Sequence, residues 1–246
     1  MITAAYTNLG QPPQEPTVYP AWKRALVVAV DQALCAAWNM VLANHADAVV
    51  TKDEDLITNA LLEELTHIRR AGYVSGFTSA LFGVPSRDAK LPDCHGVSID
   101  QMPDITIRLA ICRHGIADDR HDALFFECKV LDGSRGLDNY RVDGVDRFIS
   151  GRYAWRMPHA GMLAYVFDRS ASTPTQALTR YCKRMNDGLP ISDHMRLISG
   201  PDEVGSSTPP HASEISMTVH DRVAPVIDGE TSPIAIRHLW FTSNQL

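Results

Sequence analysis

The chain has 246 residues, of which 45% are hydrophobic, so it can bury a substantial core in one domain or in one domain with an extension. A formal net charge of -6 argues against a strongly basic nucleic-acid-binding protein, although an enzyme that contacts a few phosphates needs only a local positive surface. Met1–Gly10 has neither a basic segment nor an apolar run, which argues against a secretory signal, and no stretch reaches the roughly 18 uninterrupted apolar residues of a membrane span.

The N-terminal fifth of the chain predicts an extended arm followed by a long helix. Residues 11–20 are rich in proline and polar side chains, which favours an arm. Apolar residues recur at helical spacing over 21–46, and a broad apolar face of this kind serves core or dimer packing. We expect residues 1–50 to form an arm and helix packed on the core, and residues 51–246 to form the main domain, with a homodimer as one arrangement that the helix allows.

A second helix is predicted from Thr51 or Asp53 to Arg70, because acidic residues occupy its first turn and Gly72 follows its end. The next stretch is less regular. Residues 74–84 can hold a short strand and a turn, and residues 85–92 resemble a loop.

Two strand-like segments follow, and each carries charge where a buried strand does not usually have it. Residues 103–111 alternate apolar with polar or small side chains, with Asp104 near the start. In residues 123–131, Glu127 and Lys129 face one way, while Phe126 and Cys128 face the other. The polar stretch 112–122 reads as a hairpin-like connection, so we expect the two strands to pair antiparallel.

Such pairing could bring Asp104 beside Glu127. Burying an ion costs solvation free energy on the order of several kcal/mol. A partner charge or a metal ion must offset this cost. Two neighbouring carboxylates repel each other, and a divalent cation that prefers oxygen ligands is the usual solution.

Residues 139–156 approximate helical spacing and carry several arginines among aspartates. Arginine can bind phosphate oxygens in a bidentate manner, so part of this row can contact a nucleic-acid backbone. Ion pairs on a solvated helix face are the ordinary alternative. The arginines that we expect to contact DNA are Arg135, Arg141, Arg147 and Arg152.

The C-terminal third predicts one more core strand, a helix and two terminal strands. Residues 161–167 are apolar enough for a strand beside 123–131, and residues 175–186 favour a helix with a basic polar face. Residues 199–211 read as a loop rich in Gly, Ser and Pro. Residues 215–222 and 233–242 alternate like an edge pair added to the sheet.

The five cysteines are widely spread and odd in number, which favours reduced thiols and a cytoplasmic location. Cys94, His95, Cys112 and His114 could be drawn as a zinc site. Paired Cys-x-x-Cys spacing is absent, so packing and loop roles are favoured for these four residues.

The strand pair resembles the PD-(D/E)XK nuclease superfamily, the restriction-endonuclease-like fold. The residues that carry the resemblance are Pro103-Asp104 and Glu127-Cys128-Lys129, each in an apolar strand. A second, weaker likeness to stand-alone nucleases of bacterial defence systems covers Tyr140–Tyr153 and Ala160–Val166. The resemblance implies an α/β fold with a central mixed β-sheet flanked by helices, preceded here by the N-terminal helical extension.

For the site, the resemblance implies that Asp104, Glu127 and the main-chain carbonyl of Cys128 bind Mg²⁺, for which Mn²⁺ can substitute. It also implies that Lys129 orients or polarises the attacking water. A glutamate near the start of the preceding helix often approaches the metal in this superfamily; Glu54 is our candidate, ahead of Glu63 and Glu64. An acidic first turn that only matches the helix dipole is an equal alternative for Glu54.

The resemblance therefore implies a Mg²⁺-dependent endonuclease that hydrolyses DNA. Its expected role is defence against foreign DNA, with a partner protein of the defence system as a further expectation. A non-catalytic subunit that keeps the fold and binds nucleic acid or protein is one alternative. A zinc-stabilised interaction domain that uses Cys94, His95, Cys112 and His114 is the other.

Overall fold

The computed structural model describes residues 18–87, 90–95, 102–116, 118–167, 173–186, 196–206, 214–223, 226–227 and 230–243. Most of the predicted N-terminal arm and the end of the predicted 199–211 loop lie outside these residues. Within them, the fold is a mixed six-stranded sheet with helices on both faces, so the predicted α/β class with a mixed, helix-flanked sheet is confirmed.

The sheet has the strand order β1-β2-β3-β8-β5-β4. β2 pairs parallel with β3, and β3 pairs parallel with β8, whereas β1, β5 and β4 are each antiparallel to the strand inside them. The strands are β1 (Ile105–Arg108), β2 (Ala123–Leu131), β3 (His159–Val166), β4 (Leu197–Ser206), β5 (Glu214–His220) and β8 (Ile234–Thr242). A separate small pair is formed by β6 (Val226–Ile227) and β7 (Glu230–Thr231).

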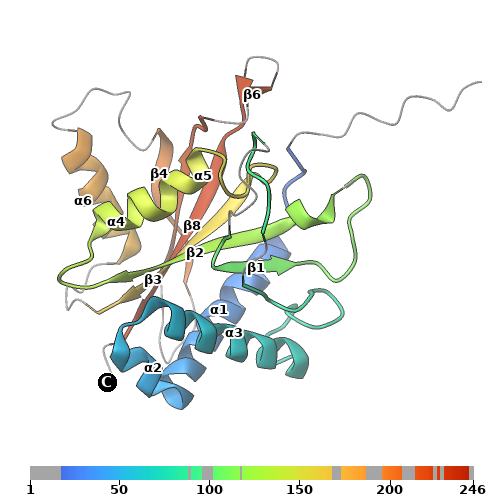
Figure 1. The fold of residues 1–246 in the computed structure, drawn as a ribbon, viewed down its shortest axis with the longest axis vertical. Helices are drawn as coiled ribbons and strands as arrows, with labels where there is room; N and C mark the ends of the chain where they lie inside the picture. The colour runs from blue at the N-terminus through green and yellow to red at the C-terminus, as the bar shows by residue number, and fades with distance from the viewer. Residues whose placement is uncertain are drawn as a thin grey trace, which may run out of the picture.

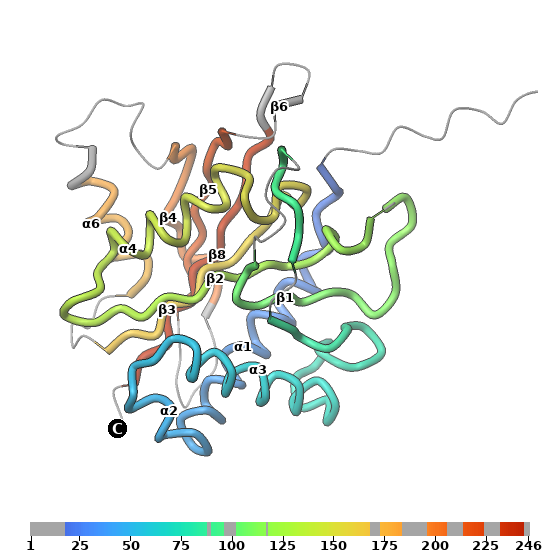
Figure 2. Tube along the Cα trace, in the orientation of Figure 1, coloured from blue at the N-terminus to red at the C-terminus, as the bar shows by residue number. Residues whose placement is uncertain are grey.

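The helices form two groups, one on each face of the sheet (Figure 1). On one face lie α1 (Arg24–Asn44), α2 (Ala46–Thr51) and α3 (Glu54–Ala71). The other face carries the continuous helical segment α4 (Leu137–Tyr140), the π-helical η2 (Arg141–Val145) and α5 (Asp146–Ile149), together with α6 (Pro174–Asn186). A short 3-10 turn, η1 (Asp119–His121), precedes β2. The tube in Figure 2 follows the same order of segments along the chain.

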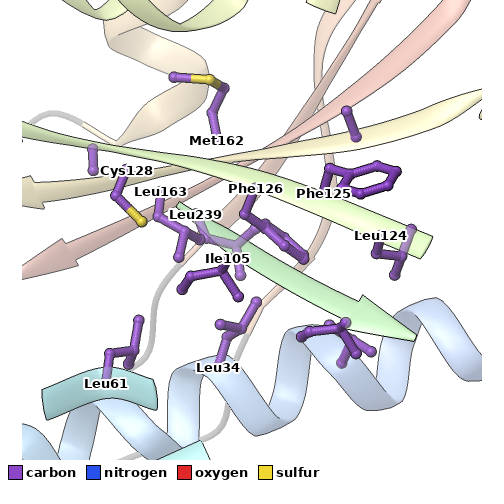
Figure 3. Packing of buried hydrophobic residues seen from close by; sticks show 14 of the residues in the cluster. Leu34, Leu61, Ile105, Leu124, Phe125, Phe126, Cys128, Met162, Leu163 and Leu239 are labelled. Atoms are coloured by element: carbon purple, nitrogen blue, oxygen red, sulfur yellow. The ribbon is translucent and has the colours of Figure 1, made fainter. Parts of the chain in front are cut away.

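The core between the sheet and the first helical group explains why every second residue of the central strands is apolar. Figure 3 shows Phe126, Cys128 and Leu163 on the side of the sheet that faces Leu34 of α1 and Leu61 of α3, all of them buried. Met162 lies on the opposite side. Because side chains alternate along a strand, Glu127 and Lys129 face the α4–α5 side, as the sequence pattern predicted.

Helix α1 is long and apolar enough to cross a membrane by length and composition alone. In the fold, 56% of its most apolar window is buried. Its buried side chains include Trp38, which stacks on Tyr165 of β3 and Phe241 of β8. The helix therefore belongs to the same core as the sheet.

The predicted C-terminal end of the helix over 21–46 is wrong. α1 ends at Asn44, the chain turns at His45, and α2 begins at Ala46. His45 has a non-helical backbone, with φ -130° and ψ 37°. Glu64 of α3 accepts a hydrogen bond from Asn44 Nδ2 at 2.9 Å and lies 3.1 Å from His45 Nε2. A carboxylate from a distant part of the sequence thus holds the corner, and helical periodicity alone does not reveal such a partner.

The second helix matches its prediction because its ends carry local signals. Asp53 caps the helix by accepting hydrogen bonds from the backbone of Asp55 at 2.9 Å and Leu56 at 3.1 Å. Gly72 ends it with a φ of 69°, a conformation that glycine adopts without steric cost. The helix consequently begins at Glu54, which fixes where that carboxylate lies.

Two predicted elements are shorter in the structure, and one predicted strand is not formed. The first strand is only Ile105–Arg108, shorter than 103–111. The helical segment ends at Ile149 rather than Arg156. Instead of a strand in 74–84, the structure has one isolated bridge between Phe82 and Leu109.

The prediction of a loop over 199–211 is wrong for its described part, because β4 runs to Ser206. β4 lies at the edge of the sheet, and its pairing with β5 shifts register three times. An edge strand with bulges tolerates glycine and proline, so those residues did not prevent pairing here. The two terminal segments pair with each other as β5 and β8, but their predicted place at the edge is wrong, since β8 lies between β3 and β5 and β4 forms the edge.

Candidate active site

The register of the first two strands brings Asp104 to β2. β1 and β2 are antiparallel, with Ile105 opposite Phe126, and Asp104 directly precedes β1. The Oδ2 atom of Asp104 accepts a hydrogen bond from the backbone N–H of Cys128 at 2.7 Å. Asp104 is therefore attached to the strand that carries Glu127 and Lys129, as the sequence predicted.

Glu127 is the most deeply buried charged group of this cluster, with 1% of its side chain exposed. Its Oε1 atom accepts a hydrogen bond from Arg147 Nη1 at 2.6 Å and lies 2.9 Å from Lys129 Nζ. Its Oε2 atom is buried and has no hydrogen-bond partner in the described structure. A buried carboxylate oxygen without a partner is costly, and it leaves one oxygen of the cluster open to a ligand.

The ammonium of Lys129 lies among three oxygens. It is 2.9 Å from Glu127 Oε1, and it donates hydrogen bonds to Glu54 Oε1 at 3.0 Å and to the carbonyl oxygen of Cys128 at 2.7 Å. The amine is thus held beside the same carbonyl and carboxylate oxygens that the resemblance assigns to a metal.

Glu54 reaches this cluster from the start of α3. Its Oε2 atom accepts a hydrogen bond from the backbone N–H of Val130 at 3.1 Å, while Oε1 contacts Lys129. Glu64 instead contacts Asn44 and His45, and Glu63 is exposed. Of the three glutamates considered from the sequence, the structure brings only Glu54 to the two charged strands.

Two further side chains complete the cluster, and sequence reasoning did not select either for the site. Arg87 lies 2.6 Å from Asp55 of α3 and 3.7 Å from Asp104, so it links the helix to β1. The hydroxyl of Tyr153 accepts a hydrogen bond from Arg147 at 3.0 Å and donates one to the carbonyl of Met102 at 3.1 Å. Arg87 lies in an irregular loop, and no local pattern identifies it.

The segment that carries Tyr153 is fixed by a buried arginine. Arg222 donates hydrogen bonds to the carbonyl oxygens of Ala154 at 3.2 Å and Trp155 at 2.6 Å, and it also contacts the carbonyl of Met157. These bonds satisfy backbone groups that no helix or strand pairs. Tyr153 is therefore held against Arg147 by rigid backbone.

The four predicted DNA-contacting arginines divide into different environments. Arg147 belongs to the carboxylate cluster, with 30% of its side chain exposed. Arg135 is paired with Asp132 at 2.7 Å and donates to the carbonyl of Lys52 at 3.2 Å. Arg152 is exposed, and Arg141 is partly buried near Asp146. The structure thus does not form one row of arginines facing outward.

The electrostatics of the cluster favour an additional cation. Burial, and then the charge of Asp104, raise the pKa of Glu127 to about 8 despite Lys129 and Arg147. Burial also raises the pKa of Asp104, partly offset by the hydrogen bond from Cys128. Burial opposes the charge of Lys129, but Glu127 and Glu54 outweigh it and raise the pKa of the ammonium. The positive groups present thus leave Glu127 incompletely compensated.

The donor set fits a hard divalent cation, although the side chains are not arranged as a ready-made metal cluster. Among the described residues, no three His, Cys, Asp or Glu side chains are gathered closely enough to hold a metal ion. Asp104, Glu127 and the Cys128 carbonyl supply oxygen atoms, which Mg²⁺ prefers, and the partnerless Glu127 Oε2 supplies a free ligand atom.

The four residues of the zinc alternative are not gathered into one site in the structure. Cys94, His95, Cys112 and His114 all lie in the described part of the chain, and they form no metal-binding group there. The exposed Cys112 thiol contacts Asp119 Oδ2 at 3.2 Å, whereas the Cys94 backbone donates to the carbonyl of Gly151. These residues have separate structural contacts.

Comparisons of the chain with protein-family models, with curated proteins and with solved structures found no match.

Proposed function

We propose that this protein is a metal-dependent nuclease of restriction-endonuclease-like architecture that hydrolyses phosphodiester bonds in DNA. The observation that carries the proposal is the convergence of Asp104, Glu127 and Lys129 on one end of a β1–β2 strand pair, with Glu127 Oε2 buried and lacking a partner. Structural ion pairs usually satisfy their buried oxygens, so an incompletely satisfied carboxylate beside an amine favours a catalytic site.

In the proposed reaction, a bound Mg²⁺ would supply charge neutralisation at the phosphate and a lowered pKa for the attacking water. Asp104, Glu127 and the Cys128 carbonyl would hold the ion. Lys129, placed by Glu54 and Glu127, would orient the attacking water and stabilise the negative charge that develops on the phosphate. Arg147, fixed by Tyr153, holds Glu127 in place.

The resemblance to nucleases of bacterial defence systems suggests foreign DNA as the substrate and allows a partner protein that supplies recognition. A cytoplasmic location agrees with this role. A homodimer would present two such sites to the two strands of a duplex.

A non-catalytic DNA-binding subunit is the second candidate. The observation that favours it is that Lys129 and Arg147 both contact Glu127 Oε1, so side chains of the protein itself offset part of the glutamate's charge. The two candidates differ in turnover, because only the enzyme requires Mg²⁺ and an intact Lys129.

The test incubates the protein with supercoiled plasmid in Mg²⁺, in Mn²⁺ and in EDTA, alongside Asp104→Asn, Lys129→Met and the exposed control Asp143→Asn. We expect metal-dependent nicking that falls on the order of a hundredfold or more in the first two variants and stays unchanged in the control. Equal nicking in the parent and in both site variants would contradict the proposal. Metal-independent DNA binding without nicking would favour the non-catalytic subunit.

A further inference from the structure

A pocket of about 500 Å³ lies away from the carboxylate cluster, between the N-terminal half of α1 and the strands β3, β8, β5 and β4. Its walls include His159 of β3, Arg237 of β8, Met217 of β5 and Val204 of β4, with Trp22 and Val28 on the helix side. A volume of this size lies within the range of about 300–1,000 Å³ that is typical of small-molecule sites.

The pocket opens on the opposite face of the sheet from Glu127. Glu127 is paired in register with Met162, and both face the helical segment on the α4–α5 side, where a side chain at Gly144 would meet them. His159 is three residues from Met162 in the same strand, so it points to the other face. Arg237 is paired with Gly161 and Met217, which places it on the face of His159. A ligand here would not contact the carboxylates.

Two arginines and one glutamate are the charged side chains of the pocket lining. Arg24 is exposed at the first residue of α1, where the helix dipole is also positive and no acidic residue occupies the first turn. Arg237 is ion-paired with the buried Asp31, but its Nε atom is buried and has no hydrogen-bond partner in the described structure. Glu203 is the acidic side chain of the lining and is exposed to solvent.

The rest of the lining is apolar. Val27, Val28, Val204 and Met217 contribute hydrocarbon surface, and Trp22 is buried with its indole N–H bonded to Asp122 at 2.7 Å. Burial and the charge of Arg237 lower the pKa of His159, so its imidazole is neutral at pH 7 and can accept or donate one hydrogen bond. An apolar body with one acidic group matches this combination of surfaces.

We propose that this pocket binds a small, largely apolar molecule that carries one acidic group, with the acid directed at Arg24 and toward the guanidinium of Arg237. The apolar part occupies the space between α1 and the strands, where its burial provides most of the affinity. Arg24, which forms no ion pair among the described residues, selects the anion over a neutral molecule of the same shape.

The test uses 1-anilinonaphthalene-8-sulfonate, a fluorescent aromatic sulfonate, titrated into the folded full-length chain without metal or DNA. We expect saturable binding with one site per chain. Arg24→Gln weakens it about three- to fivefold, as for loss of one exposed charge contact, and the exposed control Arg70→Gln leaves it unchanged. Val28→Glu, which places a carboxylate in the wall, abolishes it, and N-phenyl-1-naphthylamine, which lacks the sulfonate, binds about tenfold more weakly.

Circular dichroism and melting curves confirm that each variant is folded before its binding is interpreted, and Arg24→Gln tests the site by itself if Val28→Glu does not fold. Absence of saturable binding to the parent would overturn the inference. Equal binding by the parent and Arg24→Gln, or equal binding of the neutral naphthylamine, would overturn the assignment of an acidic group. Because the readout involves no DNA cleavage, its failure is independent of the nuclease proposal.

Discussion

The carboxylate of Glu54 bridges α3 and β2 by accepting a hydrogen bond from the backbone N–H of Val130 at 3.1 Å and another from Lys129 Nζ at 3.0 Å. The two segments are 76 residues apart in the sequence, yet this single side chain fixes both the strand and its amine. The first residue of a helix is thereby part of the proposed catalytic site.

Glu54→Gln is expected to reduce plasmid nicking by about tenfold or more while leaving the fold intact. Glutamine can still accept the Val130 hydrogen bond, but it removes the negative charge that helps to hold Lys129. The matched control is Glu63→Gln, an exposed glutamate of the same helix. Equal loss in both variants would show that the effect comes from α3 in general.

Arg147→Gln is expected to lower the rate of cleavage at saturating DNA by about 10- to 100-fold, the usual effect of removing a group that orients a metal ligand. Arg147 donates to Glu127 at 2.6 Å and to Tyr153 at 3.0 Å, so its loss releases the glutamate. Arg152→Gln, an exposed arginine nearby, changes DNA affinity at most. Rates and DNA affinities are measured separately, and a loss confined to affinity would assign Arg147 to DNA binding instead.

Glu127→Gln is expected to abolish nicking and yet to stabilise the metal-free protein. The folded pKa of about 8 lies above the ordinary 4.5, so between these pH values the unfolded chain loses a proton that folded Glu127 keeps, and the resulting loss of stability grows until the pH passes 8. Removing the charge should raise the free energy of unfolding at pH 8 by about 1–2 kcal/mol, or roughly 2–4 °C in Tm per kcal/mol.

Melting curves in EDTA and in Mg²⁺ check this prediction. Mg²⁺ should raise the Tm of the parent, because a ligand that binds only the folded state stabilises it, and should not shift Glu127→Gln. A variant less stable than the parent in EDTA would show that Glu127 is a structural ion-pair partner. Na⁺ at the same ionic strength serves as the control for a general salt effect.

His238 is expected to make the protein labile to acid. Its buried imidazole lies 2.8 Å from the hydroxyls of Tyr140 and Thr218, and burial, then the charge of His220, lower its pKa to about 3. Below pH 6.5 this histidine binds a proton in the unfolded chain but stays neutral in the folded protein. The free energy of unfolding is therefore full at neutral pH and falls as the pH decreases. The contribution at pH 5 is a loss of about 2 kcal/mol.

Urea unfolding at pH 7 and pH 5 measures that loss. The decrease between the two pH values should be about 2 kcal/mol smaller in His238→Asn, whereas His67→Asn, which alters an exposed histidine, should behave as the parent does. Parallel pH profiles for the parent and His238→Asn would contradict the assignment.

Two glycines near the site are expected to respond differently to alanine. A Cβ at Gly161 of β3 would collide with the ring of Phe126, while one at Gly144 would meet the flexible end of Met162. Gly161→Ala should destabilise by about 1–3 kcal/mol because the ring is held in the core, whereas Gly144→Ala should cost less and gain helix propensity of up to about 1 kcal/mol. Urea unfolding of both variants checks the order, and a larger loss for Gly144→Ala would contradict it.

Local patterns in the sequence determined the elements that carry the candidate site. The alternation from Ala123 to Leu131 predicted the whole of β2 and the shared face of Glu127 and Lys129. Asp53 and Gly72 delimited α3 because capping depends on residues next to the helix ends. These features are set by neighbours in the chain, so a single sequence reveals them.

Only the tertiary structure decided which distant groups meet these elements. Glu54, which the sequence left equally open as an acidic first turn, reaches Lys129 because the start of α3 lies against β2. Arg87 and Tyr153 join the cluster from irregular segments. β8 entered the middle of the sheet, where a terminal strand had been expected at the edge. Strand order and long-range ion pairs depend on how helices and strands pack in three dimensions, and hydrophobic periodicity records only which face of each element is buried.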